Sequence, residues 1–169
     1  GVQTCALPIS LAGAALLVTA RALAATLARE QPALTLFGQQ SIDGNGACLW
    51  AAVAERLQLP VLSQLVDLAI DQGAVTGRRQ TEVGDERVRA PLPAIVAVSD
   101  AINEPRYPSL KGIMGARSRE IRTLGLADLG LDGGSVGGAA ATTSLVGTTT
   151  PAARGAARII KDPPAEAAR

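Results

Sequence analysis

The feature that most constrains the fold is a short apolar run that ends in glycine and leads through a polar loop into an amphipathic segment. The apolar run ALTLFG spans residues 33–38 and predicts a buried parallel strand, because it is short and is closed by glycine. The loop QQSIDGNG follows at residues 39–46, and ACLWAAVAERLQ at residues 47–58 predicts a helix that buries Leu49, Val53 and Leu57. A strand, a sharp loop and a helix in this order form the core unit of a doubly wound α/β sheet.

A helix and a β-hairpin are expected on either side of this unit. Ser10 provides an N-cap for an Ala-rich helix that ends just before Pro32. Residues 64–70 and 74–82 alternate between polar and apolar side chains around a short Gly-containing turn, which predicts a hairpin inserted into the sheet. A further turn is expected at Gly84-Asp85.

The second half of the chain changes from apolar to basic and then to low complexity. AIVAVSD at residues 94–100 predicts a second buried strand, and a proline-containing loop then leads to a short basic helix at residues 110–119. Gly, Ala, Thr and Ser dominate residues 133–169, which are expected to form an extended C-terminal arm. The predicted fold class is therefore α/β: a doubly wound, Rossmann-like parallel sheet with an inserted hairpin.

The composition excludes several classes of function. The chain contains no histidine, which rules out His-based metal sites and Ser–His or Cys–His catalytic pairs. Phe37, Trp50 and Tyr107 are its only aromatic residues, too few for a surface that stacks nucleic-acid bases, and the net charge of +1 gives no bulk attraction to nucleic acid. The apolar N-terminal segment contains arginine, so no membrane insertion is expected. Cys5 and Cys48 form no disulfide framework, which fits a reducing, cytoplasmic location, and Cys48 is expected to be a small buried hydrophobe.

Two motifs resemble those of a known family. INEPRYPSLKGIM at residues 102–114 joins Asn-Glu-Pro-Arg-Tyr to a leucine-containing loop and a basic helix, directly after a buried strand. LFGQQSIDGNG at residues 36–46 joins a strand to the loop Gly-x-Gln-x-Ile-Asp-Gly. The segments between and after these motifs follow the same order, including LADLGLD at residues 126–132. Across residues 10–132 the sequence therefore resembles the β subunit of electron transfer flavoproteins.

This resemblance implies that the sheet is incomplete and of the adenine-nucleotide-binding type. It also implies an electron carrier rather than an enzyme. The β subunits of the family form heterodimers with an α subunit that holds most of the FAD, and the flavin carries out the redox chemistry. The implied function is to pass electrons from acyl-CoA-type or related dehydrogenases, through that FAD, toward the respiratory chain. Many members also bind AMP.

Two other functions fit parts of the sequence. A stand-alone adenine-nucleotide-binding regulator of universal-stress-like architecture fits the α/β pattern but leaves residues 102–114 without a role. A secreted or membrane-anchored protein rests only on the apolar segment after residue 10, and no Lys or Arg precedes that segment.

The loop between the first strand and its helix is the candidate nucleotide site. Its backbone N–H groups and the helix dipole favour a phosphate or the edge of an adenine ring. The alternative is an ordinary connecting loop in which glycines serve the turn geometry and Asp43 forms an Asx turn. The AMP-binding relatives have polar residues where this chain has Ala47, Cys48 and Leu49, so weak or absent AMP retention is predicted. The cofactor-binding residues assigned to this loop are Gly38, Gln39, Gln40, Ser41, Ile42, Asp43, Gly44, Asn45 and Gly46.

The second candidate site surrounds the basic helix. Leu110 matches the family's anchor residue, which inserts into a hydrophobic pocket of the dehydrogenase; the alternative is that it packs onto its own domain. The basic residues nearby would steer an acidic partner surface, or form an ordinary solvated helix face. The docking residues assigned here are Leu110, Lys111, Ile113, Met114, Arg117 and Arg119. The preceding Asn103, Glu104, Pro105, Arg106 and Tyr107 either stabilise the loop or contact the α subunit.

The first nine residues, GVQTCALPI, are expected to be translated sequencing adapter. They can be encoded by GGA GTT CAG ACG TGT GCT CTT CCG ATC, which matches a common adapter, and the next base begins the codon of Ser10. Residues 10–132 are then expected to be the C-terminal two-thirds of a β-type domain, followed by the arm at residues 133–169. The absence of the preceding strands is expected to leave one edge of the sheet exposed.

Overall fold

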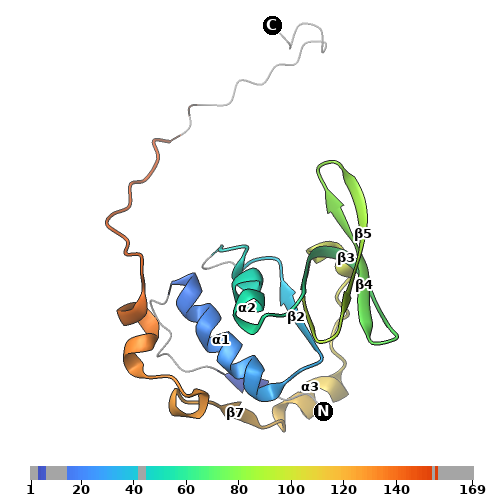
Figure 1. Ribbon diagram of the computed structural model, residues 1–169, viewed down its shortest axis with the longest axis horizontal. Helices are drawn as coiled ribbons and strands as arrows, with labels where there is room; N and C mark the ends of the chain where they lie inside the picture. Colours follow the sequence, from blue (N-terminus) through green and yellow to red (C-terminus); the bar gives the residue numbers. More distant parts are fainter. Residues whose placement is uncertain (1–3, 7–14, 42–44, 154, 156–169) are drawn as a thin grey trace, which may run out of the picture.

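The computed structural model describes residues 4–6, 15–41, 45–153 and 155. These residues form an α/β fold in which two packed helices lie against one face of an open five-stranded sheet (Figure 1). Several expectations fall on other parts of the chain. Ser10 and the expected start of the first helix, residues 42–44 of the candidate nucleotide loop, and most of the arm beyond residue 153 lie outside the described residues.

The sheet is parallel on one side and antiparallel on the other. Its strand order is β2-β6-β3-β4-β5; β2, β6 and β3 run parallel, whereas β4 and β5 continue the sheet in antiparallel fashion. The predicted parallel strands and the inserted hairpin are thereby confirmed. The strands are β2 (Leu34–Gly38), β3 (Val61–Asp71), β4 (Ala74–Thr81), β5 (Gly84–Pro91) and β6 (Ala94–Val98).

The doubly wound arrangement stays a prediction. In the described part of the chain, α1 (Leu16–Glu30) and α2 (Leu49–Leu57) pack against each other and against Ile95 on the same face of β6. The opposite face of β6 packs against apolar side chains of β3, β4 and β5. Among the described residues, therefore, helices cover only one face of the sheet.

The prediction that the first strand is buried is wrong, because β2 is an edge strand. Leu36 of β2 is 58% exposed, whereas its neighbour Phe37 points to the opposite face and packs against the helices. The second predicted strand, β6, lies between β2 and β3 and is buried at every residue except Val98, which is partly exposed. Both strands are short and apolar, so their positions in the sheet, rather than their compositions, decide which is buried.

The antiparallel part is a three-stranded meander rather than a single hairpin. The turn expected at Gly84-Asp85 lies two residues earlier, because Gly84 already pairs with Thr81 across the loop Glu82-Val83. A bulge in β3 shifts the register between Leu65 and Asp67, and bulges bend the strand that carries them. The meander thereby contributes to a core on the face of the sheet away from the helices. The buried residues of this core are Leu62, Leu65, Val75, Ala90, Ala94 and Val96.

The two helices approach closely because small side chains line their contact. Ala20 and Ala24 of α1 are buried against Val53 and Ala54 of α2. The predicted end of the first helix is confirmed: Gln31 adopts the left-handed conformation, and its N–H donates to the carbonyl oxygen of Leu27 at 2.8 Å. None of the helices in the described ranges is both long enough and apolar enough to span a bilayer.

The segment after residue 120 wraps around α1. Arg29 of α1 donates to the carbonyl oxygen of Asp128 at 3.1 Å, and Arg21 donates to that of Ser135 at 3.3 Å. Val136 is 3% exposed, so residues that we assigned to the arm are partly packed against the domain. Residues 142–153 contain neither helix nor strand. The short elements here are β7 (Ile121–Thr123), which pairs with β1 (Thr4–Ala6), and 3-10 turns at Ala127–Leu129, Gly133–Ser135 and Gly137–Ala140.

Candidate functional site

A cleft opens at the carboxyl end of β2, where the predicted nucleotide loop leads into α2. It is a hollow of ≈ 610 Å³ bounded by the N-terminal turn of α1, the end of β2, the loop and the first turn of α2. In open α/β sheets, ligands bind outside the carboxyl ends of the parallel strands. The cleft therefore lies where the fold favours a ligand.

Most of the assigned loop residues that the structure describes line this cleft, namely Gly38, Gln39, Gln40, Ser41 and Gly46. Asn45 does not line it. Its N–H donates instead to the carbonyl oxygen of Ser41 at 3.0 Å, and Asn45 adopts a left-handed conformation with φ 44°. Ile42, Asp43 and Gly44 lie outside the described residues, so the assignment of these three stays a prediction.

The sequence interpretation missed two walls of the cleft. Leu16 and Thr19 come from α1, a helix to which we assigned no site residue. Phe37 and Trp50 add aromatic surface from the end of β2 and the start of α2. The signal for Trp50 was available, because the only tryptophan of the chain lies four residues after the Gly-rich loop ends at Gly46. The contribution of α1 has no local signal, because it depends on how the helices pack.

The cleft offers neutral polar groups and apolar surface. Its polar side chains are Thr19, Gln39, Gln40 and Ser41, and no charged side chain belongs to the lining within the described residues. The first N–H groups of α2 have no partner inside the helix, as at any helix start. A planar, uncharged ring would find apolar surface in the cleft. A phosphate would be held only by neutral groups and the helix dipole.

Cys48 occupies the N-cap position of α2 and is exposed, so the prediction that it is a buried hydrophobe is wrong. Its carbonyl oxygen accepts hydrogen bonds from the N–H groups of Ala51 and Ala52, both at 3.1 Å, and its side chain makes no capping hydrogen bond. The preceding Ala47 has φ 25°, a strained value for a residue with a β-carbon. Cys48 is exposed because it precedes the first turn of α2, at a point where the chain has not yet reached the buried face of the helix.

The second candidate site is the exposed helix α3 (Leu110–Arg117), which confirms the predicted helix but ends two residues earlier than expected. Ser109 caps it, because the N–H of Gly112 donates to Ser109 Oγ at 3.1 Å. Leu110 is 75% exposed, Met114 63% and Ile113 41%. Positions i, i+3 and i+4 lie on one helix face, so these three side chains form an apolar surface open to solvent. Leu110 therefore does not pack onto its own domain.

The basic residues of the docking assignment are also exposed. Lys111, Arg117 and Arg119 have no ion pair with any carboxylate in the described part of the chain. In the preceding loop, Tyr107 is 97% exposed. Over residues 103–107, all of which are described, no side-chain hydrogen bond is formed. The interpretation of these residues as a network that stabilises the loop thus gains no support.

The fold and its two exposed features define a class of protein: an α/β domain with a cleft at the carboxyl edge of its sheet and a solvent-exposed helix that carries an apolar face. The comparison with known protein families gives a match over most of the chain. Residues 9–129 match the electron transfer flavoprotein domain, and the chain therefore belongs to this family.

The similar curated proteins are mostly subunits of electron transfer flavoproteins. The chain is 38% identical over 151 residues to the electron transfer flavoprotein subunit beta of Mycobacterium tuberculosis, an alignment that covers 89% of this chain and 57% of that protein. The chain is 39% identical to the corresponding subunit of Mycobacterium leprae, and this alignment also covers 89% of this chain and 57% of that protein. The caffeyl-CoA reductase-Etf complex subunit CarD of Acetobacterium woodii is 33% identical, over 75% of this chain and 48% of that protein. The chain thus spans about half the length of these relatives.

Proposed function

We propose that the chain is part of a β-type subunit of an electron transfer flavoprotein and acts as an electron carrier in a heterodimer with an α subunit. Family membership and the names of the similar proteins support this role. The relative from Acetobacterium woodii is named as a subunit of a reductase–Etf complex, which fits a protein that works beside an enzyme. A cytoplasmic location belongs to the proposal, because a chain with two cysteines suits a reducing compartment.

The observation that carries this proposal is the exposed apolar face of α3. An isolated domain gains nothing from leaving Leu110, Ile113 and Met114 in water. Burying one leucine contributes about 1.5–3 kcal/mol, which suits a transient complex rather than a permanent one. We therefore assign Leu110 as the anchor for an acyl-CoA-type or related dehydrogenase, with Lys111 and Arg117 attracting an acidic surface around the partner's pocket. A stand-alone nucleotide-binding regulator has no use for such a helix.

The test is electron transfer from a dehydrogenase to the complex of this subunit with its α subunit. Leu110→Ala is expected to reduce the second-order rate about tenfold or more, since it removes about 1.5–3 kcal/mol of burial. Val83→Ala is the matched control, because Val83 is 93% exposed at the tip of the β4–β5 hairpin, on a different element. Both variants should assemble with the α subunit. An undiminished rate for Leu110→Ala would refute the anchor role.

FAD is assigned mostly to the α subunit, and it supplies the redox chemistry when bound. The residues of this chain would then support and position the flavin-containing subunit. For AMP, the cleft beside β2 fits only in part: Phe37 and Trp50 suit the adenine ring, but no cationic side chain in the described lining meets the phosphate.

We infer that the chain retains AMP weakly or not at all. The measurement is the nucleotide released on denaturing the purified protein, identified by mass spectrometry. A stoichiometric amount of AMP would contradict this inference.

A further inference from the structure

The strand β5 has a free edge with a regular set of main-chain groups. It is the last strand of the five-stranded sheet, and β4 pairs with only one of its sides. A two-residue hairpin loop is closed by a hydrogen-bonded pair, here Thr81 and Gly84, and hydrogen-bonded and non-hydrogen-bonded pairs then alternate along the ladder. Arg87 and Arg89 fall at non-hydrogen-bonded positions, opposite Arg78 and Thr76. Their N–H and C=O groups therefore point away from β4, toward the free edge.

The side chains of the same two residues lie on one face of the sheet. Arg87 and Arg89 are two positions apart in β5, and alternate residues of a strand point to the same side. This is the face opposite to the core, because the intervening Val88 packs against the core cluster. Both arginines are exposed. The main chain and the side chains of these residues are thus accessible together.

The arginines of β5 differ from the neighbouring arginines of β4 in forming no ion pair among the described residues. Arg78 pairs with Asp67 at 3.3 Å and with Asp85 at 3.0 Å, and Arg79 pairs with Glu86 at 2.6 Å. No carboxylate of the described residues lies within ion-pair distance of Arg87 or Arg89. The meander therefore leaves two adjacent positive charges unpaired at its edge.

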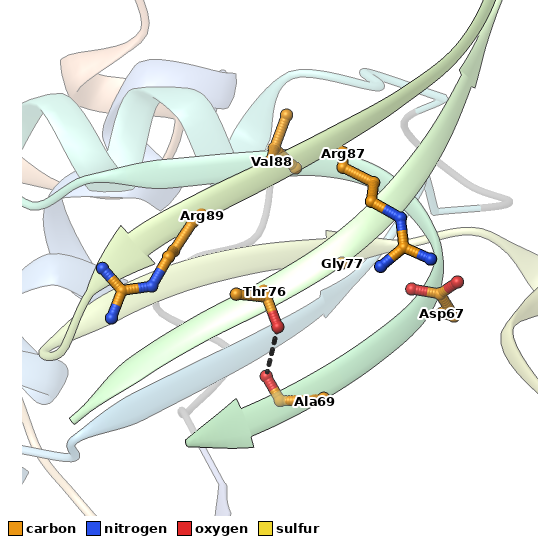
Figure 2. A pocket seen from close by; sticks show the side chains of 7 residues that line it. All are labelled: Asp67, Ala69, Thr76, Gly77, Arg87, Val88 and Arg89. Atoms are coloured by element: carbon orange, nitrogen blue, oxygen red, sulfur yellow. Dashed lines mark hydrogen bonds between the residues drawn. The ribbon is translucent and has the colours of Figure 1, made fainter. Parts of the chain in front are cut away.

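A shallow hollow separates the two guanidinium groups. It measures ≈ 270 Å³, and besides the two arginines its lining contains Asp67 and Ala69 of β3, Thr76 and Gly77 of β4, and Val88 of β5. Figure 2 shows that the Arg87 side chain reaches over the sheet toward Asp67, whereas the Arg89 side chain extends in the other direction. The floor between them combines small residues with the carboxylate of Asp67, and it lies over β3 and β4 rather than at the free edge of β5.

We propose that an extended, acidic segment of a partner protein pairs with β5, with carboxylates at alternate positions held by Arg87 and Arg89. Main-chain hydrogen bonds to a sheet edge supply affinity in such strand additions, and the side chains at alternate positions supply specificity. Opposite charges on neighbouring strands stabilise the pair, so Glu or Asp beside each arginine satisfies both unpaired charges. A strand, rather than an isolated anion, accounts for the free main-chain groups as well as for the charges. This surface is separate from α3 and does not depend on the function of α3.

The first experiment uses peptides, so that the protein itself is unchanged. A fluorescently labelled peptide of alternating Glu and Val is titrated with the full 169-residue chain, and binding is followed by fluorescence anisotropy at low and high salt. We expect saturable binding that weakens with salt, and at least about threefold weaker binding of a peptide with Gln in place of Glu. A peptide methylated on the amide nitrogens that face β5 should not bind measurably, because it cannot complete the ladder.

Variants then locate the surface. Arg87→Gln and Arg89→Gln should each weaken binding of the acidic peptide about threefold, and the double variant about tenfold. Arg56→Gln is the matched control, with the same change of charge on the distant helix α2, and should bind as the unaltered chain does. Circular dichroism confirms that each variant is folded.

Three outcomes would overturn the proposal. The first is equal binding of the Glu and Gln peptides, and the second is undiminished binding of the methylated peptide. The third is binding of inorganic polyphosphate that Arg87→Gln and Arg89→Gln abolish while binding of the acidic peptide is unchanged, which would assign the arginines to a simple anion site.

Discussion

The replacement Gly77→Ala tests how the bent meander packs onto the sheet. Gly77 lies on β4 between β3 and β5, and it is buried. A β-carbon at this position would lie 2.5 Å from the carbonyl oxygen of Asp67 and 2.6 Å from Cδ1 of Leu65. Both separations are well inside van der Waals contact. Leu65 is fully buried and the oxygen of Asp67 belongs to the main chain of β3, so neither atom moves without disturbing the core or the ladder.

The magnitude follows from two opposing effects. Inserting one carbon into a packed core costs about 1–3 kcal/mol. The restriction of the unfolded chain by alanine returns about 0.4–1 kcal/mol. The free energy of unfolding should therefore fall by about 1–2 kcal/mol, which corresponds to a decrease of about 3–6 °C in the melting temperature for a domain of this size.

The assay is urea unfolding of the chain followed by circular dichroism, with Gly115→Ala as the matched control. Gly115 lies on α3, and a β-carbon there would meet nothing within 4 Å. The same residue is introduced in both variants, so their effects on the unfolded chain largely cancel and the difference reports the packing at Gly77. If the two variants unfold at the same urea concentration, the contact of Gly77 with Leu65 does not exist as described.

Three further expectations concern other parts of the molecule. Leu65→Ala should lower the free energy of unfolding by about 2–5 kcal/mol in the same urea assay, because it empties a fully buried position; a loss below about 1 kcal/mol would place Leu65 outside the core. Arg79→Gln should change stability by less than about 1 kcal/mol, and the change should shrink in high salt, because its pair with Glu86 is partly exposed; a larger, salt-independent effect would contradict this. Resequencing of the parent locus should find no codons for GVQTCALPI before Ser10, and their presence there would overturn the adapter interpretation.

Local signals in the sequence predicted the elements but not their environments. The end of α1 before Pro32, the parallel strands and the short basic helix were all predicted, because turn chemistry and hydrophobic period act over a few residues. The burial of β2 was predicted wrongly, since its apolar composition resembles that of β6. Which of the two is central depends on pairing with β3, a strand far along the chain.

The candidate cleft was likewise predicted only in part from the local sequence. The loop after β2 was identified from its glycines and its place between a strand and a helix, and five of its residues line the hollow. The wall that α1 contributes was not predicted, because it depends on how closely the alanines of α1 allow the two helices to approach. Cys48 was misplaced for a related reason: its exposure depends on how the loop turns before the first turn of α2.

The order of the residues was enough to determine that this chain forms an α/β domain with a Gly-rich loop, a short basic helix and the motifs of the electron transfer flavoprotein family. Strand order, the bend at the bulge of β3, and the unpaired arginines at the edge of β5 were decided only in three dimensions. Hydrophobic period and turn chemistry are properties of neighbouring residues. Edges, clefts and unpaired charges arise from contacts between distant ones, which no short stretch of sequence contains.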